Sequence, residues 1–516
     1  ADPTPWLYAA LIKRNSLRYN EALADLQQSI DLNDNRSLFR STSLLDEDIA
    51  VRRSNLADIY QEAGLPTQAL AEAGKAVQRD YTNFAAHDFL ARVYRQSFDE
   101  TNINQRNDNA LANEFFLRNI FAPVGAGIAS QRVSNQEYGS LFNARGFSGT
   151  VEARYDSREH FNTTGFFTYQ GSNYEVGVEL EHQDWDTLTI NDDFQSTTAQ
   201  LHFKFEPSTQ DRFYSLLVWS ETEQGDLRSL PNPDAVNGTV RDITIADGSD
   251  PFFPAGTTVF SPATVSNYPI NAAYGRDPEF ESDEAQEPLF FSTYARTWNE
   301  AHTSLFLYGW ADTQRTTADP LTVVSSSNTT TDPAAARVYQ SSYEIEQDFD
   351  LHTFELQHIW KQERSQLIAG ARFQTGELED DITTRAAVSE SVPDFLFPTI
   401  IPFAVNIAGS GTTEEDFERL AVYTQFSHEI SERHTLILGF KYDYMEYVDG
   451  LGSIPRSGQS QNASQLSPQL GFLWQLEPNW LLRGAYARTM SGFQLEERLR
   501  LEPTNIAGLT TSFASI

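Results

Sequence analysis

Histidines and clustered carboxylates are the side chains of this sequence that could bind a metal ion or catalyse a reaction. His352 and His358 share one face of a predicted strand but stand six residues apart. A strand rises about 3.3 Å per residue, so the two rings would lie about 20 Å apart, too far for one metal ion. The carboxylates of Asp380, Asp381 and residues 414–416 have no histidine beside them, and we interpret them as solvated charge. Because nucleophile-elbow, phosphate-loop and zinc-helix motifs are also absent, the sequence predicts no catalytic residue, cofactor or metal site.

Polar side chains at every second position of apolar segments indicate a different kind of site. In 199–205 and 435–444, charged or polar residues alternate with aliphatic and aromatic ones. Successive side chains of a strand point to opposite faces, so one face can meet lipid while the other lines an aqueous lumen. The residues expected to face the lumen are Gln200, His202, Lys204, Lys441 and Asp443. Those expected to face lipid are Leu201, Phe203, Leu438 and Phe440. Because Lys441 is expected to face the lumen, Lys441→Ala should have only a mild effect on stability.

Thirteen segments show strand character and must position these side chains. They are roughly 148–155, 163–170, 174–183, 195–205, 212–222, 288–298, 302–314, 346–361, 366–375, 417–428, 434–446, 464–476 and 480–490. Short connections, such as 171–173, alternate strictly with longer ones, such as 223–287, 315–345, 376–416 and 447–463. An up-and-down barrel requires this parity, whereas a Greek-key sandwich does not. In outer-membrane barrels the short turns are periplasmic and the long loops are outside.

Residues 1–97 have helical periodicity instead. Small and large residues in 56–76 follow the tetratricopeptide-repeat spacing, and part of the pattern recurs 34 residues later. The signature positions are Leu56, Ala57, Tyr60, Gly64, Ala69, Ala76 and Tyr94. The small ones are expected to let two antiparallel helices approach closely. Such repeats bind partner segments on their concave surface, so we expect a periplasmic protein partner there; a plain helical spacer is the alternative.

Composition limits the remaining possibilities. A chain of 516 residues is too long for one ordinary core, so at least two domains with separate cores are expected. The net charge of −35 argues against nucleic-acid binding. The sequence has no cysteine, which excludes thiol catalysis and disulfides. No apolar run is long enough for a transmembrane helix.

Four segments resemble the barrel strands of TonB-dependent receptors: 418–425, 436–444, 467–471 and 482–486. The resemblance implies an outer-membrane β-barrel. Those receptors carry a plug domain before the barrel, and residues 101–147 are too few to form one. A periplasmic repeat domain fused to a barrel is also similar in layout to bacterial exopolysaccharide exporters.

The sequence therefore predicts an α+β multidomain protein of the bacterial outer membrane. Residues 1–97 are expected to form periplasmic tetratricopeptide-like repeats. A connector follows at 98–147, in which 113–120 could form a helix. Residues 148–516 are expected to form an antiparallel transmembrane β-barrel. The expected function is porin-like transport or export of a solute or polymer. Receptor-like uptake without a visible plug, or a non-transporting assembly or adhesion role, are the alternatives.

Two further expectations concern the barrel. The acidic loops 222–285 and 376–414 could hold cations that bridge lipopolysaccharide, so outer-membrane lipid and lipopolysaccharide are expected partners. The apolar stretch 395–403 is expected to cover the mouth of the barrel or to pack on a partner. Thirteen is an odd number, whereas single-chain bacterial barrels usually close with an even one. We therefore expect an unclosed sheet, with further strands after Ile516.

Overall fold

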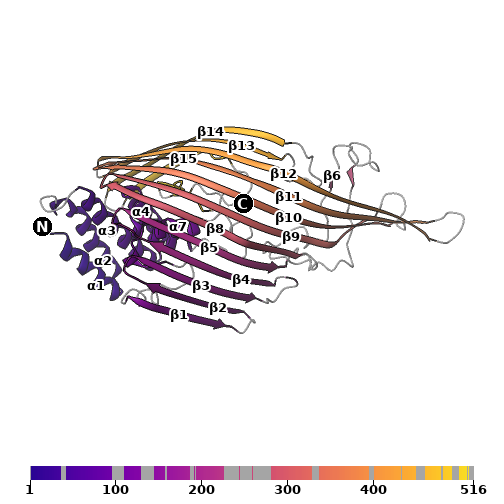
Figure 1. Cartoon of the computed structure of the whole chain (residues 1–516), viewed down its shortest axis with the longest axis horizontal. Helices are drawn as coiled ribbons and strands as arrows, with labels where there is room; N and C mark the ends of the chain where they lie inside the picture. The colour runs from indigo at the N-terminus through magenta and orange to yellow at the C-terminus, as the bar shows by residue number, and fades with distance from the viewer. Residues whose placement is uncertain are drawn as a thin grey trace.

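A helical region and one large antiparallel sheet make up the computed structural model of this chain (Figure 1). The structure describes residues 2–36, 42–95, 110–129, 145–156, 160–185, 191, 193–225, 243–244, 258–259, 281–327, 336–393, 400–431, 433–448, 460–477, 480–490, 499–507 and 509–510. The helices are α1 (Thr4–Asn15), α2 (Tyr19–Asp31), η1 (Asn33–Arg36), α3 (Thr42–Glu62), α4 (Pro66–Arg79), α5 (Phe84–Tyr94), α7 (Ala110–Phe121) and η3 (Val124–Ala126). None of the helices in these ranges is long and apolar enough to cross a membrane.

Helices α3 and α4 form the hairpin in which the repeat signature lies. Leu56, Ala57, Ala69 and Ala76 are buried in it, and a proline in the first turn of α4 suits a helix start. Gly64 does not stand at a close approach of two helices as predicted, because a Cβ added there would meet no atom within 4 Å. It lies instead in the turn between them with a φ of +75°, a conformation that side chains other than glycine disfavour.

Each of the thirteen strands of the main sheet pairs with its neighbour in sequence order. The strands are β1 (Gly146–Tyr155), β2 (Phe161–Gln170), β3 (Tyr174–Trp185), β4 (Phe194–Phe205), β5 (Asp211–Gln224), β8 (Glu281–Asn299), β9 (His302–Ser327), β10 (Ala336–Gln362), β11 (Ser365–Pro393), β12 (Ile400–Ser431), β13 (His434–Val448), β14 (Ser460–Glu477) and β15 (Trp480–Ala487). Two short pairs, β6 (Ile243–Thr244) with β7 (Thr258–Val259) and β16 (Asn505–Ile506) with β17 (Leu509–Thr510), stand apart. The number of main strands matches the predicted thirteen, and within the described ranges no pairing joins β1 to β15.

Two predicted long connections are wrong, because β9 to β12 continue far beyond the expected strand ends. Pairing between β9 and β10 extends to Ser327 with Ala336, and pairing between β11 and β12 extends to Pro393 with Ile400. The backbone ladder persists here although apolar and polar residues no longer alternate, so the sequence signal ends before the strand does. The predicted acidic loop 376–414 is therefore mostly strand. Of the apolar stretch 395–403, only 400–403 is described, as the start of β12; most of the acidic connection 222–285 lies outside the described residues.

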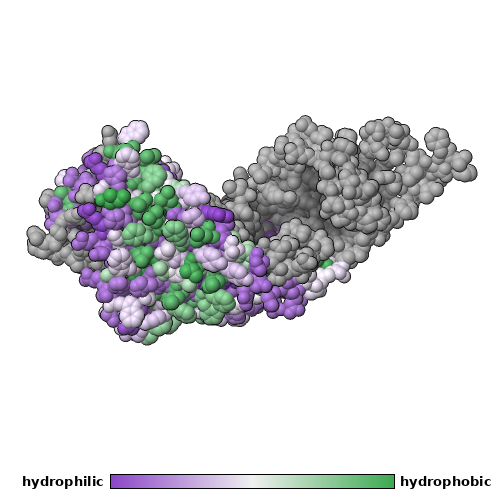
Figure 2. All heavy atoms as spheres, turned by 90° about the horizontal axis from the view of Figure 1, so that it is seen from above, coloured by the Kyte–Doolittle hydropathy of each residue, from purple (hydrophilic) through white to green (hydrophobic). Residues whose placement is uncertain are grey.

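The helices lie at the end of the sheet where the short turns are, and the long strands extend from the opposite end (Figure 1). On the outward face, apolar side chains remain exposed along successive strands; examples are Trp219, Phe306, Leu356, Phe440 and Leu470. In the space-filling view, apolar patches gather over the middle of the described part (Figure 2). This is the arrangement that a lipid-facing surface requires.

The prediction of separate cores for the helices and the sheet is wrong. One continuous cluster of buried apolar residues includes Ala69 of α4, Leu90 of α5 and Phe116 of α7 together with Tyr214 and Phe291 of the sheet. The reason is that α7, within the predicted connector, packs on the concave face of β5 and β8. The ring of Phe116 lies 5.8 Å from that of Tyr214 and 5.7 Å from that of Phe291.

Candidate functional site on the concave face of the sheet

Buried polar and charged side chains cover the concave face of the sheet. They come from alternate positions of β3, β4 and β10 to β13: Glu175, His202, Lys204, Glu355, Gln357, Arg372, Gln374, Arg419, Lys441 and Asp443. Of the five predicted lumen residues, four are buried on this face and Gln200 is half-buried. The four predicted lipid-facing residues are exposed. That the concave face lines an open lumen stays a prediction, because segments of the same chain cover the described part of it.

Residues 124–129, which follow α7, cover the strands β3 and β4. The Nζ atom of Lys204 donates to the carbonyl oxygen of Gly127 at 3.3 Å, and the backbone N–H of Ile128 donates to Glu175 at 3.1 Å. The Arg118 guanidinium also donates to the Gly127 carbonyl, at 2.5 Å. Lys204 and one carboxylate oxygen of Glu175 thus find partners in an irregular backbone segment, which has amide and carbonyl groups free to bind them.

Residues 499–507, here called the strap, cover β10 to β14. Every strap residue from Arg500 to Ala507 is buried. The backbone of Leu501 is held by side chains: its N–H donates to Glu355 at 3.0 Å, and its carbonyl accepts from Tyr81 at 2.8 Å and from Gln357 at 2.5 Å. The strap therefore lies between the helices and the sheet and is bonded to both.

A charged cluster lies where the strap crosses β11, β12 and β13. The Nζ atom of Lys441 is 2.9 Å from a carboxylate oxygen of Glu502 in the strap and 3.4 Å from Asp443. Arg419 pairs with Asp443 at 3.0 Å. Burial alone would raise the pKa of Glu502, but Lys441, Arg500 and Arg372 together lower it to about 2. Glu502 is therefore an anion at neutral pH.

The far end of the strap contacts the sheet through apolar groups. Ile506 and Ala507 pack with Ile437 and Leu473. A Cβ at Gly471 of β14 would lie 2.6 Å from the Cγ2 atom of Ile506. Gly471 therefore gives the strap room to approach the strand.

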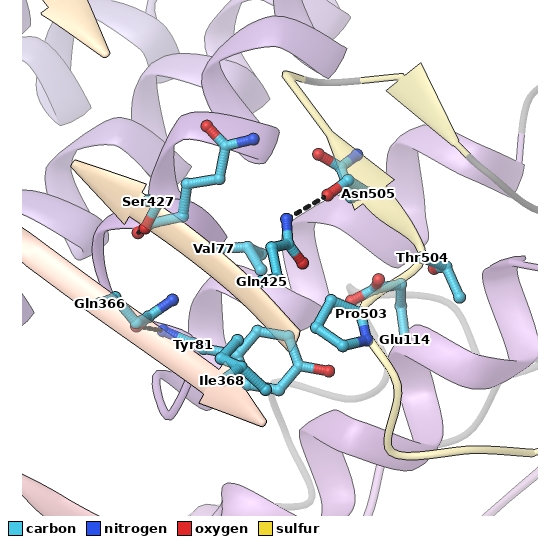
Figure 3. A pocket seen from close by; sticks show the side chains of 11 residues that line it. Val77, Tyr81, Glu114, Gln366, Ile368, Gln425, Ser427, Pro503, Thr504 and Asn505 are labelled. Atoms are coloured by element: carbon cyan, nitrogen blue, oxygen red, sulfur yellow. Dashed lines mark hydrogen bonds between the residues drawn. The ribbon is translucent and has the colours of Figure 1, made fainter. Parts of the chain in front are cut away.

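Only a small cavity separates the strap from the strands at its centre (Figure 3). Figure 3 shows Gln425 of the sheet donating to the Asn505 carbonyl of the strap at 3.2 Å, whereas Gln366 accepts from the Tyr81 backbone N–H at 2.9 Å. The cavity volume is about 20 Å³. This is room for about one water molecule, so a solute could enter only after the strap moves.

A larger groove, of about 330 Å³, lies between helices α2 to α4 and the short turns of the sheet. Arg79 of α4 pairs there with Glu429 of β12, and the Lys75 ammonium lies 3.4 Å from the Gln475 side chain of β14. Close by, Lys361 of β10 pairs with Asp80 at 3.0 Å. These polar contacts hold the helical region against the turns.

The other residues considered for chemistry do not form a site. His352 bonds Tyr308, whereas His358 bonds His302 on the neighbouring strand. Asp380 is buried and accepts a hydrogen bond from Gln347 at 2.8 Å, but its neighbour Asp381 is exposed. Across the described ranges, no three histidine, aspartate or glutamate side chains gather in a way that could hold a metal ion.

Sequence reasoning missed the most charged part of the site. Arg372 and Arg419 occupy inward positions of two predicted strands, so the alternation that selected Lys441 would also have selected them. Glu502 had no such signal, because it lies in a segment without strand or helix periodicity. Only the fold brings it beside Lys441.

Comparisons with known proteins place these observations in context. Residues 232–495, just over half of the chain, match the family model described as TonB dependent receptor-like, beta-barrel. No curated protein matches the sequence. Similar solved structures include BauA, the ferric preacinetobactin receptor of Acinetobacter baumannii (9% identity, TM-score 0.41, 65% of this chain and 46% of that one). They also include the siderophore receptor PiuA of the same organism (13%, 0.39, 68% and 50%) and the ferric-catecholate import receptor Fiu of E. coli K12 (13%, 0.38, 67% and 54%). The chain spans about half the length of these structures.

Proposed function

Because the chain belongs to the TonB dependent receptor-like β-barrel family, we propose that its sheet forms the wall of an outer-membrane barrel that takes up a solute. The match to a receptor-like β-barrel model supports the outer-membrane location predicted from the sequence, and it favours a receptor role over an enzymatic one. Receptor-like uptake, only an alternative expectation from sequence, is preferred here to export of a polymer.

One observation carries the proposal. Thirteen antiparallel strands follow one another in sequence order, with apolar side chains on the outward face and buried charges on the concave face. Buried charges are costly unless they are paired or meet water or a ligand. A concave face that keeps so many of them, and is covered by irregular segments rather than by strands, is suited to a transport path whose cover can move.

The arrangement of the domains is part of the proposal. Residues 148–516 contribute the barrel wall, which closes when β1 and β15 meet further strands or each other, since hydrocarbon does not tolerate unpaired strand edges. The helices of 1–97, as tetratricopeptide-like repeats, lie on the periplasmic side with the short turns. Residues 110–129 and the strap cover the concave side of this wall.

A periplasmic protein is the proposed partner of the helical region. Tyr8, Ile12 and Leu17 are exposed apolar residues on or beside α1, and exposed apolar patches mark interaction sites. Ile12→Glu should abolish cross-linking of a periplasmic protein to a photoreactive side chain at position 8. The matched control is Asn15→Glu, an exposed polar position on the same helix. Equal loss from both variants would contradict a role for the apolar surface.

Conductance across planar bilayers tests the transport proposal. The protein purified from outer membranes should show little conductance while the strap is in place. Replacing 499–507 by a Gly-Ser segment of equal length should give stepwise openings, because only about one water fits beneath the strap in the intact protein. A strapless variant that inserts as a folded barrel but never conducts would contradict a transport path.

Accessibility of introduced cysteines tests the orientation, because the sequence has none of its own. In intact cells, a membrane-impermeant maleimide should react with cysteine at Thr412, near the far end of the long strands, and not with cysteine at Ser208 in a short turn. Permeabilised cells are the control, in which both positions should react. The reverse pattern in intact cells would invert the proposed orientation.

A further inference from the structure

The site of Glu502 is formed by three adjacent strands. Ala421 of β12 stands between Arg372 of β11 and Asp443 of β13 in the register of the sheet. Arg419 lies two residues along β12, on the same face, and Lys441 lies two residues along β13 from Asp443. Because Ala421 is small and fully buried, the longer charged side chains can converge above it. The wall thus presents three cations around the place where the strap crosses.

The strap supplies an anion to this place. The Glu502 carboxylate accepts from the Lys441 ammonium at 2.9 Å. The guanidinium of an arginine can bind a carboxylate through two parallel hydrogen bonds and keeps its charge at any physiological pH. Among the described residues, Asp443 and Glu355 are acids near these cations, and both stay on the wall when the strap leaves. A second anion is therefore favoured at the position that Glu502 leaves.

The strap is attached in a way that permits it to leave. At Leu501 its backbone bonds to the side chains of Glu355, Tyr81 and Gln357, and at Asn505 to the side chain of Gln425, rather than to the backbone of a main-sheet strand. Lifting the strap breaks these bonds without breaking any pairing between the strands of the wall. Water or a polar solute can then satisfy the groups that it leaves.

We propose that Glu502 is a built-in occupant of an anion site on the wall, and that a solute bearing carboxylate groups binds Arg372, Arg419 and Lys441 when it displaces the strap. This rests on the proposed function, since it names the chemical class of the solute that the barrel takes up. Two of the cations that lower the pKa of Glu502, Lys441 and Arg372, belong to the wall and are among the groups that would bind the solute's carboxylate. The strap and the solute compete for one site.

Calorimetry with glutarate as the probe tests the competition. A built-in competitor weakens apparent affinity in proportion to the time that it occupies the site. Glu502→Gln should therefore bind glutarate at least tenfold more tightly than the unaltered protein, and adding Lys441→Gln should remove that binding. The matched control is Glu363→Gln, an exposed carboxylate in the short turn between β10 and β11, which should leave affinity unchanged. Equal affinity of the Glu502→Gln variant and the unaltered protein would overturn the proposal.

Reactivity of a single cysteine gives a second measurement that does not depend on Glu502→Gln folding. Thr504→Cys places a thiol of similar size at a strap position that is 2% exposed. Glutarate should speed its reaction with maleimide at least tenfold relative to sodium chloride of equal ionic strength, because the strap is displaced. Equal rates in the two salts would overturn the proposal. Both measurements are made in detergent, so a failure of the conductance experiment, which concerns transport, can be told apart from a failure of the anion site.

Discussion

Phe116→Ala should detach the helical region from the sheet, because Phe116 is the aromatic side chain of α7 that contacts both β5 and β8. The ring is 2% exposed and lies within 6 Å of the rings of Tyr214 and Phe291. Truncating a buried phenylalanine to alanine costs about 3–5 kcal/mol, a range that includes the cavity left behind. Two lost ring contacts, each of about 0.5–1.5 kcal/mol, favour the middle or upper part of that range. We take about 4 kcal/mol as the expected loss.

Urea unfolding in detergent can measure this loss. If the free energy of unfolding falls by about 2 kcal/mol per molar urea, a loss of about 4 kcal/mol lowers the urea concentration at the unfolding midpoint by about 2 M. Helical circular dichroism reports the helices, and the gel migration of the folded barrel reports the sheet. The helical signal should be lost at about 2 M less urea than in the unaltered protein.

The matched control is Phe306→Ala, the same change on the outward face of β9, where the ring is 44% exposed. It should move the helical midpoint by little, because none of the described helices contacts that face. If Phe116→Ala and Phe306→Ala gave the same helical midpoint, α7 would not be docked on the concave face, and the shared core would be wrong.

Four further predictions concern the wall, the strap and the helices. Leu438→Arg should destabilise the protein in lipid vesicles by about 2–4 kcal/mol if it lies near the midplane, and a loss no larger than that of Leu438→Phe would contradict its outward position. Lys441→Ala should lower the free energy of unfolding in the same vesicles by about 3–5 kcal/mol, because it leaves the Glu502 carboxylate buried without the ammonium that it bonds. This differs from the mild effect expected from sequence, and a loss under 1 kcal/mol would contradict it. The folded pKa of Glu502, about 2, lies below its ordinary 4.5, so its contribution to strap docking should be complete above about pH 4.5 and lost as the pH falls towards 2. Labelling of cysteine at Thr504 should rise over that window, and Glu502→Gln should abolish the pH dependence. Ala69→Trp should separate α3 from α4 and, because the core is shared, also lower the urea midpoint of the sheet; an unchanged sheet would show that the two cores are independent.

Strands that carry an apolar face could be predicted from sequence, and those without one could not. β4 and β13 alternate strictly, because lipid or a core selects the residues of one face and polar surroundings select those of the other. In the outer half of β11, the buried positions read Leu378, Asp380 and Ile382, so an acidic residue interrupts the apolar alternation that would mark the strand. Backbone pairing with β12 continues there nonetheless. Propensity and alternation report the surroundings of side chains, whereas the ladder itself has no sequence signature.

That α7 and the strap cover the concave face could not be predicted from sequence, for a different reason. A helix at 113–120 could be expected from its residues, and α7 is present, but its amphipathic pattern does not say which surface it packs on. Likewise, the lumen-facing alternation selected Lys441, but its partner in the strap is 61 positions away in a segment with no periodic pattern. Contacts between distant irregular segments are set by the finished fold, which local spacing does not contain.

The sequential order of the strands has a consequence for how this chain acquires its structure. Strands that are neighbours in sequence can pair as soon as both exist, so the sheet can grow one hairpin at a time. The helical region is different: the hydrogen bond from Tyr81 to Leu501 joins residues 420 positions apart, and that from Lys75 to Gln475 joins residues 400 apart. Contacts of such large sequence separation form slowly, because the intervening chain must first be ordered. The helical region, although synthesised before the sheet, therefore reaches its final contacts after it.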